Sequence, residues 1–115
     1  MKLCGVCIIT NNAPRLATFY ATVLQEQPGV DGNHYGFDNA QLAVYDPGNV
    51  SVVNEKNMSI MFYVDNVQRE YERLLKEIPC ISIASPPECR PWGAFSFWFL
   101  DPDGNTVSFI EQKGV

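Results

Sequence analysis

Four cysteines and a single histidine carry the most obvious chemistry in this sequence, either metal binding or nucleophilic attack. Cys4 and Cys7 form a C-x-x-C motif, while Cys80 and Cys89 lie nine positions apart. Zinc motifs usually keep each pair about two to four residues apart, so the second pair is too wide. Cys4 and Cys7 also fall in an apolar strand, where an odd spacing sends them to opposite faces. We therefore expect reduced, buried or half-buried thiols rather than a zinc site.

Other familiar catalytic sets are missing from the sequence. It has no G-x-S-x-G elbow, no P-loop and no G-x-G-x-x-G. Cys7 and His34 would form a nucleophile pair only if the fold brought them together, and a lone histidine beside a turn is more often structural or solvent-facing. A site of two histidines and one carboxylate cannot be built from one copy of the chain, because His34 is its only histidine.

The elements that must position these groups follow the order β-α-β-β-β, twice. Asn12 and Asn66 each cap a helix soon after a strand. Pro14 lies in the first turn of one helix, and Pro79 ends the other. The remaining elements follow from apolar periodicity. The expected strands are 3–10, 34–38, 41–45, 50–54, 59–65 and 81–84, with loops at 25–33 and 85–91 and a final hairpin within 91–112.

Length and composition describe one globular domain, 1–115, made of two modules at about 1–54 and 58–115. The formal charge of −5 argues against nucleic acid and anionic membranes as partners. No apolar run is long enough to span a bilayer, and no cleavable apolar segment follows the first residues. We therefore expect a cytoplasmic protein.

The final hairpin has two different faces. Its turn is Asp101-Pro102-Asp103-Gly104-Asn105, and pairing Leu100 with Thr106 sets its register. One face is apolar and needs a helix packed on it; it holds Phe95, Phe97, Phe99, Val107 and Phe109. The other face is mixed and suits the lining of a pocket; it holds Ser96, Trp98, Leu100, Thr106, Ser108 and Ile110. Trp98 is either part of that lining or simply a buried aromatic residue.

This pattern resembles the vicinal oxygen chelate superfamily, which includes glyoxalase I, the extradiol dioxygenases and the fosfomycin- and bleomycin-resistance proteins. Trp92-Gly93, a strand, the 101–105 turn and a closing strand look like its C-terminal signature. Residues 18–24 look like its first helix, and residues 62–67 like the opening of its second module. The turn at 46–49 also echoes the one at 101–105, which supports a repeat.

The resemblance implies an α+β fold in which two βαβββ modules form a curved mixed sheet with helices on the convex face. Two such half-cups close around a ligand, and small relatives often pair as dimers to complete their sites. Enzymes of the superfamily hold a divalent metal on the first and last strands of each module. Those positions fall here on Gly5, Val52, Ser59 and Ser108. None offers an imidazole or a carboxylate, and the parity of Glu111 places it on the face opposite Ser108, so we expect no metal and no cofactor.

What remains is a cup of aromatic, thioether and hydroxyl groups, typical of a binding pocket rather than a catalytic site. Trp92, beside Gly93, is a second candidate for stacking, or else a loop residue packed on a neighbouring strand. The predicted lining is Gly5, Cys7, Ile9, Ser59, Met61, Tyr63, Ser96, Trp98, Ser108 and Ile110, with Trp92 and His34 as further ligand-binding candidates.

We interpret the chain as a metal-free, homodimeric binding protein, closest in character to the bleomycin-resistance branch. Its ligand would be a hydrophobic or cationic compound such as an antibiotic, held by stacking and cation–π contact. Two alternatives stay open. One is a glyoxalase-like, metal-dependent lyase, isomerase or dioxygenase. The other is a non-catalytic structural or regulatory partner whose cup is filled by its own side chains.

Overall fold

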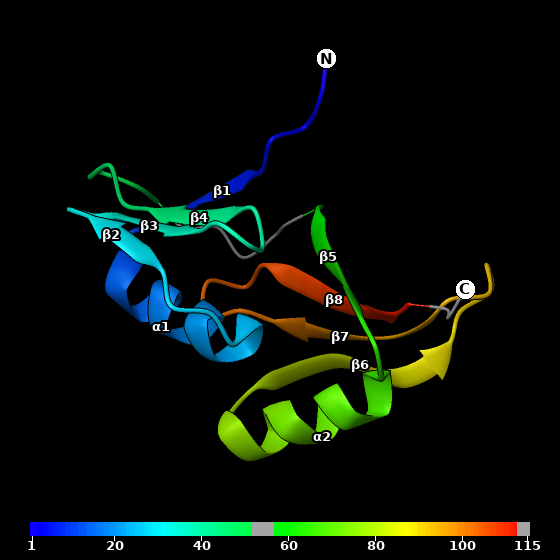
Figure 1. The fold of residues 1–115 in the computed structure, drawn as a ribbon. Coiled ribbons are helices and arrows are strands. Elements are labelled where there is room, and N and C mark those ends of the chain that lie inside the picture. Colours follow the sequence, from blue (N-terminus) through cyan, green and yellow to red (C-terminus); the bar gives the residue numbers. More distant parts are fainter. Residues whose placement is uncertain (52–56, 113–115) are drawn as a thin grey trace. The chain divides into compact units, whose positions relative to one another are not determined.

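A computed structural model describes residues 1–51 and 57–112 and contains two units with the same topology (Figure 1). The units are Met1–Val53 and Asn54–Val115. The first contains β1 (Val6–Ile9), α1 (Ala13–Leu24), β2 (Gly29–Asp31), β3 (His34–Phe37) and β4 (Leu42–Tyr45). The second contains β5 (Ser59–Val64), α2 (Val67–Glu77), β6 (Ser82–Cys89), β7 (Phe95–Leu100) and β8 (Thr106–Glu111).

Each unit forms a four-stranded mixed sheet with one helix, in the orders β1-β4-β3-β2 and β5-β8-β7-β6. The first strand of each unit runs parallel to the last, and the other neighbours are antiparallel. The predicted α+β fold of two βαβββ modules is therefore confirmed. Within the described residues, neither helix is long and apolar enough to cross a membrane.

Both helices begin at the predicted asparagine caps. The side chain of Asn12 accepts a hydrogen bond from the Arg15 N–H at 3.2 Å, and that of Asn66 accepts from the Arg69 N–H at 3.0 Å. Each cap satisfies one of the backbone donors left free in a first helical turn. The two caps also align the sequences of the two units, since a shift of 54 positions places Asn12 at Asn66.

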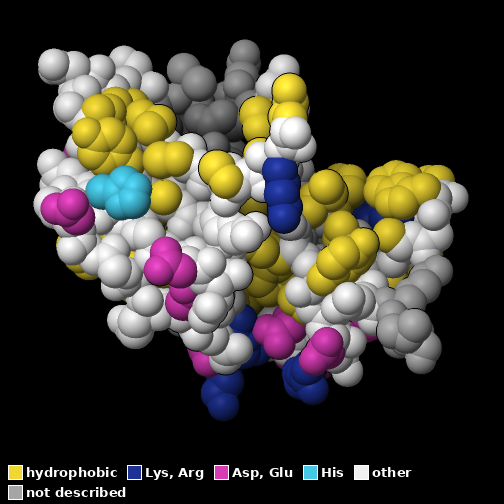
Figure 2. Space-filling model, turned by 45° about the horizontal axis from the view of Figure 1, so that its top comes forward, with side chains coloured by type: hydrophobic (Ala, Val, Ile, Leu, Met, Phe, Trp, Pro, Cys, Tyr) yellow, Lys and Arg dark blue, Asp and Glu magenta, His cyan; other side chains and the backbone are white. Residues whose placement is uncertain are grey.

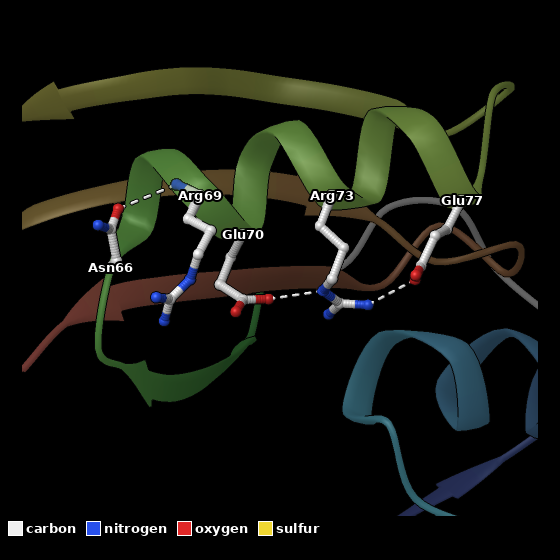
Figure 3. A network of polar contacts seen from close by, with 5 residues as sticks. All are labelled: Asn66, Arg69, Glu70, Arg73 and Glu77. Atoms are coloured by element: carbon white, nitrogen blue, oxygen red, sulfur yellow. Dashed lines mark hydrogen bonds and ion pairs between the residues drawn. The ribbon is translucent and has the colours of Figure 1, made fainter.

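One side of α2 carries ion pairs one turn apart (Figure 3). The Arg73 guanidinium lies between two carboxylates, with Nε 2.8 Å from Glu70 and Nη1 2.7 Å from Glu77. Such helical pairs each contribute a few tenths of a kcal/mol. The side chains of Glu70 and Arg73 are only 16% and 15% exposed, so these ion pairs are largely shielded from solvent, and Val67 and Leu74 are the fully buried residues of α2.

The phenylalanine face of the final hairpin forms the core of the second unit. Leu100 pairs with Thr106, which confirms the predicted register. Phe97, Phe99 and Phe109 are at most 3% exposed and meet one another at ring-centroid distances of 5.3–5.7 Å. Tyr71 of α2 packs edge-on against Phe97 at 5.3 Å. The helix therefore covers this face, as predicted.

The first unit differs from the prediction in where its strands lie. The first strand after helix α1 is β2, inside the segment 25–33 that we predicted to be a loop. Residues 50 and 51 of the predicted strand 50–54 are not in a strand, and 52–54 lie outside the described residues. The strand β2 has three residues, all exposed at the edge of the sheet, so it carries no apolar alternation to detect.

This difference also removes the predicted echo between two turns. The turn at 46–49 follows β4, whereas 101–105 joins β7 to β8. The true counterpart is the shorter turn at 38–41, between β3 and β4. In both turns a residue with positive φ, Gln41 at 55° and Gly104 at 85°, donates its N–H to the carbonyl of an aspartate, Asp38 or Asp101.

Two further predicted boundaries are wrong. The strand β6 continues through 85–89, which we predicted to be a loop because of Pro86 and Pro87. Proline is tolerated there because β6 is an edge strand whose register shifts twice along β7. The strand β1 begins at Val6 rather than Leu3. A Cβ on Gly5 would lie 2.7 Å from the Gln41 carbonyl oxygen, so only glycine fits this backbone position.

Candidate functional site

The face of the second sheet opposite its helix carries a row of side chains directly in register. Met61 of β5 pairs with Ser108 of β8, which pairs with Trp98 of β7. This row borders a cleft of ≈180 Å³. The complete lining is Ser59, Met61, Trp92, Ala94, Ser96, Trp98, Thr106, Ser108 and Ile110. None of these side chains is charged, so the cleft is an apolar space edged with hydroxyl groups.

A second, wider cleft of ≈430 Å³ adjoins the first and shares Trp92, Ala94 and Ile110 with it. Tyr63 and Glu111 are among its other residues. Trp92 and Tyr63 are 70% and 71% exposed, so neither is packed into the protein. Hydrophobic side chains, yellow in Figure 2, form exposed patches on the surface shown there.

Arg90 contacts two residues that line this cleft, Ser96 and Trp98, and it was not among the predicted site residues. It is 7% exposed although it is charged. Its Nε donates to the Ser96 hydroxyl at 2.9 Å, and its Nη2 donates to the Ser96 carbonyl at 3.1 Å. Its Nη1 donates to the Ser85 hydroxyl at 2.9 Å and also pairs with Glu88. The only available signal was an arginine in the proline-rich segment 85–91, which resembles a loop.

The same guanidinium lies over the indole of Trp98, with its carbon 4.3 Å from the ring centroid. Arg90 is not among the residues that border the cleft, whereas Trp98 is. One face of the indole therefore packs on a fixed cation, and the rest of the ring borders the cleft. Trp98 is half-buried, in contrast to Phe97 beside it, which is fully buried.

Three other predicted site residues border a separate cleft of ≈440 Å³ in the first unit. Gly5, Cys7 and His34 line it, together with Cys4. The His34 ring, cyan in Figure 2, lies 5.9 Å from the Tyr45 ring. Partial burial raises the pKa of the Cys7 thiol above its ordinary value. Cys7 is therefore even more fully protonated at neutral pH than an ordinary cysteine, which makes it a poor nucleophile.

The prediction of buried or half-buried thiols is wrong, because all four cysteines are exposed. Cys4 precedes the strand β1, so strand parity does not separate it from Cys7, and both border the same cleft. In the described parts of the chain, no group of three or more His, Cys, Asp or Glu residues could hold a metal ion.

The four positions where relatives would hold a metal do not fit one here. Gly5 has no room for a side chain, and Ser59 and Ser108 offer only hydroxyls. The predicted fourth position, Val52, lies outside the described residues and was placed by the wrong turn. Cys7 pairs with Ala43 as Met61 pairs with Ser108, so the counterpart of Ser108 is Ala43, which bears only a methyl group.

Glu111 lies on the helix side of the sheet, as its parity predicts. Its Oε1 accepts a hydrogen bond from the Val67 N–H at 3.0 Å, at the first residue of α2. A carboxylate at a helix N-terminus satisfies a free donor and complements the helix dipole. Its role is therefore to cap α2, and it does not border the ≈180 Å³ cleft beside Ser108.

The profile of the Glyoxalase/Bleomycin resistance protein/Dioxygenase superfamily matches residues 3–109. The chain belongs to this superfamily, also called the vicinal oxygen chelate superfamily. The match does not resolve the branch. Among curated proteins, none is similar enough to match.

Solved structures share the fold over nearly the whole chain. A protein of unknown function from Agrobacterium tumefaciens has a TM-score of 0.81 at 20% identity, covering 98% of this chain and 95% of its own. A superfamily member from Sphaerobacter thermophilus has a TM-score of 0.70 at 22% identity, covering 97% and 98%. A glyoxalase-related enzyme from Fulvimarina pelagi has a TM-score of 0.76 at 18% identity, covering 97% and 89%. At these identities the likeness concerns the fold alone.

Proposed function

We propose that this protein binds a small, largely apolar molecule with an aromatic ring in the ≈180 Å³ cleft of its second unit, without a metal. The observation that carries this proposal is the uncharged lining around Trp98. A cavity of about 150 Å³ lined by apolar side chains accommodates benzene, so this cleft matches a single ring. The adjoining ≈430 Å³ cleft leaves room for a substituent.

The lining supplies both attraction and orientation. Burying one ring against Trp98 and Met61 is worth roughly 1.5–3 kcal/mol. Ser108 is 4% exposed and borders the cleft, and among the described residues its hydroxyl has no hydrogen-bond partner. It is therefore available to a hydroxyl or carbonyl group of the ligand. A ring alone is expected to bind only at millimolar concentrations, so tighter binding needs the substituent or a second copy of the chain.

A homodimer is part of the proposal. Met61, Tyr63 and Trp92 are 66–71% exposed on one unit, and burial by a second copy would remove this apolar area from water. We expect a total interface above roughly 1,600 Å² and a sedimentation mass twice that of one chain. Sedimentation as a monomer at micromolar concentration would contradict it. A cytoplasmic location and the sequestration of an antibiotic also remain proposals.

The second candidate function is that of a metal-dependent lyase, isomerase or dioxygenase. The third is that of a non-catalytic structural or regulatory protein whose cup is filled by its own side chains. Glycine at position 5 and alanine at position 43 argue against the usual metal site. Elemental analysis of protein purified without added metal is expected to find far less than one equivalent of zinc, nickel, manganese or iron. A stoichiometric metal that survives dialysis against a weak chelator would favour the enzyme.

Binding can be followed at the two indole N–H groups, since the chain has only two tryptophans. In ¹⁵N–¹H spectra, acetophenone at millimolar concentrations should shift the Trp98 cross-peak saturably, with Trp92→Phe used for assignment. Met61→Ala should weaken binding by roughly fivefold or more through lost contact area. Leu75→Ala, an exposed change on the outer face of α2, is the control and should leave it unchanged. A Trp98 cross-peak that never moves would contradict the proposal.

A further inference from the structure

We propose that Arg90 determines the charge of the ligand: the cleft accepts uncharged or anionic aromatic molecules and rejects cations. This inference rests on the proposed function and names its ligand class more narrowly. It departs from the cationic ligand that the sequence suggested. The residue that changes the expectation is the buried arginine against Trp98.

The guanidinium of Arg90 is fixed in place. Its side chain is 4% exposed, and its donors are held by Ser96, Ser85 and Glu88. Its backbone closes the turn that leads to Trp92, because the Arg90 N–H donates to the Ala94 carbonyl at 2.7 Å and the Arg90 carbonyl accepts from the Gly93 N–H at 2.9 Å. A charge held at this many points cannot swing aside when a ligand enters.

This cation occupies a face of the Trp98 indole, 4.3 Å from its centroid. A ring attracts a cation through the negative potential of its π-face, and Arg90 already uses that attraction. It also draws electron density toward itself, so the remaining surface of the ring is less negative. A cationic ligand would meet a weakened ring and repulsion from Arg90 behind it. An electron-rich or anionic aromatic group meets neither.

The nearby carboxylates do not reverse this preference. Glu88 pairs with Arg90, but its side chain is 59% exposed and solvent screens it. Glu111 borders only the adjoining cleft, and its Oε1 is engaged by the Val67 N–H. No charged side chain borders the ≈180 Å³ cleft itself.

The test uses three probes that share one phenyl ring: phenyltrimethylammonium as the cation, acetophenone as the neutral molecule and benzenesulfonate as the anion. Each is titrated against the Trp98 indole cross-peak at fixed ionic strength. On the wild-type chain, the cation should bind at least about fivefold more weakly than acetophenone. Benzenesulfonate should bind at least as tightly as acetophenone. A cation that binds as tightly as acetophenone would overturn the role of Arg90.

A variant at Glu88 sharpens the test without disturbing the core. Glu88→Gln keeps an acceptor for Arg90 but removes the opposing charge, so the ratio of sulfonate to cation affinity should rise about two- to threefold. Glu72→Gln on the exposed side of α2 changes the net charge equally and should leave the ratio unchanged. Equal ratios in the two variants would overturn the inference. If no probe moves the Trp98 cross-peak, the proposed function fails and this inference falls with it; binding without charge discrimination overturns Arg90 alone.

Discussion

The two units build the same sheet but place different side chains in the row that borders their clefts. In the second unit the row is Met61, Ser108 and Trp98; at the same register the first unit has Cys7, Ala43 and Gly36. The repeated topology therefore does not make two equivalent sites. The bulky side chains, the aromatic ring and the buried arginine are all in the second unit.

The comparison distinguishes the features that stabilise the shared fold, which we call the frame, from the side chains that form the binding site. The asparagine caps and the parallel pairing of first and last strands recur in both units. The Arg90–Trp98 contact belongs to the second unit, where a tight turn at 90–93 positions the arginine. Changes to the frame should thus affect stability, whereas changes to the row should affect binding.

The largest effect is expected from Phe97→Ala. Phe97 is fully buried against Tyr71 and two other rings, so its loss leaves a cavity that should lower the free energy of unfolding by about 3–5 kcal/mol. Trp98→Ala should cost less, because Trp98 borders a space that is already partly open. Denaturation curves of the two variants provide the measurement. A greater loss for Trp98→Ala would mean that Trp98 is a core residue and that the pocket assignment is wrong.

Replacing two glycines of the first unit by alanine should change stability by different amounts. Gly5→Ala forces a Cβ to within 2.7 Å of the Gln41 carbonyl oxygen and should destabilise the protein by roughly 1–3 kcal/mol. Gly36→Ala, in the row opposite Ala43, places its Cβ 3.7 Å from the nearest atom, the His34 Cε1, and should be nearly neutral. Thermal unfolding of both variants tests this contrast. A Gly5→Ala variant as stable as Gly36→Ala would show that Gly5 does not approach the Gln41 carbonyl as closely as described.

A smaller effect is expected where β8 caps α2. Glu111→Ala removes the acceptor for the Val67 N–H and should cost about 1 kcal/mol of folding stability. Glu111→Gln keeps an acceptor oxygen and should cost only part of that. Urea denaturation separates the two. If instead Glu111→Ala left stability unchanged and abolished binding of a metal, the assignment of Glu111 as a cap would be wrong.

The smallest effect concerns the cleft of the first unit. Because partial burial raises the pKa of the Cys7 thiol, its thiolate fraction should stay low at neutral pH and rise only at a higher pH than that of an ordinary cysteine. Alkylation by iodoacetamide, followed by peptide mass spectrometry, should reach its half-maximal rate at a higher pH than alkylation of free cysteine. A midpoint near neutral pH would show that Cys7 is an activated nucleophile and would make the cleft of the first unit a candidate active site.

Much of the frame could be predicted from the sequence, because its signals are local. The turn at 101–105 sets the register of the hairpin, and alternating phenylalanines identify the face that α2 covers. The short strand β2 and the proline-containing end of β6 could not be predicted, since both lie at sheet edges and lack apolar alternation. The same is true of Arg90, whose contact with Trp98 depends on the path of the turn at 90–93.

For the site, too, local patterns could be predicted from the sequence, whereas contacts between strands could not. The residues of the predicted lining could be named from strand parity, but their distribution over separate clefts depends on which strands pair. Placing a metal position on Val52 failed because a turn sequence was used in place of strand pairing. Because Cys7 pairs with Ala43, the fourth metal position corresponds to Ala43.

The central claim is that the second unit, and not the first, provides the ligand site. A crystal structure of the protein grown with millimolar acetophenone tests it most directly. We expect density for one ring in the cleft between Met61 and Trp98, within hydrogen-bond reach of the Ser108 hydroxyl, with Arg90 still on the indole. A ring bound instead beside Cys7 and His34, or a cleft filled by the Trp98 side chain itself, would contradict the account.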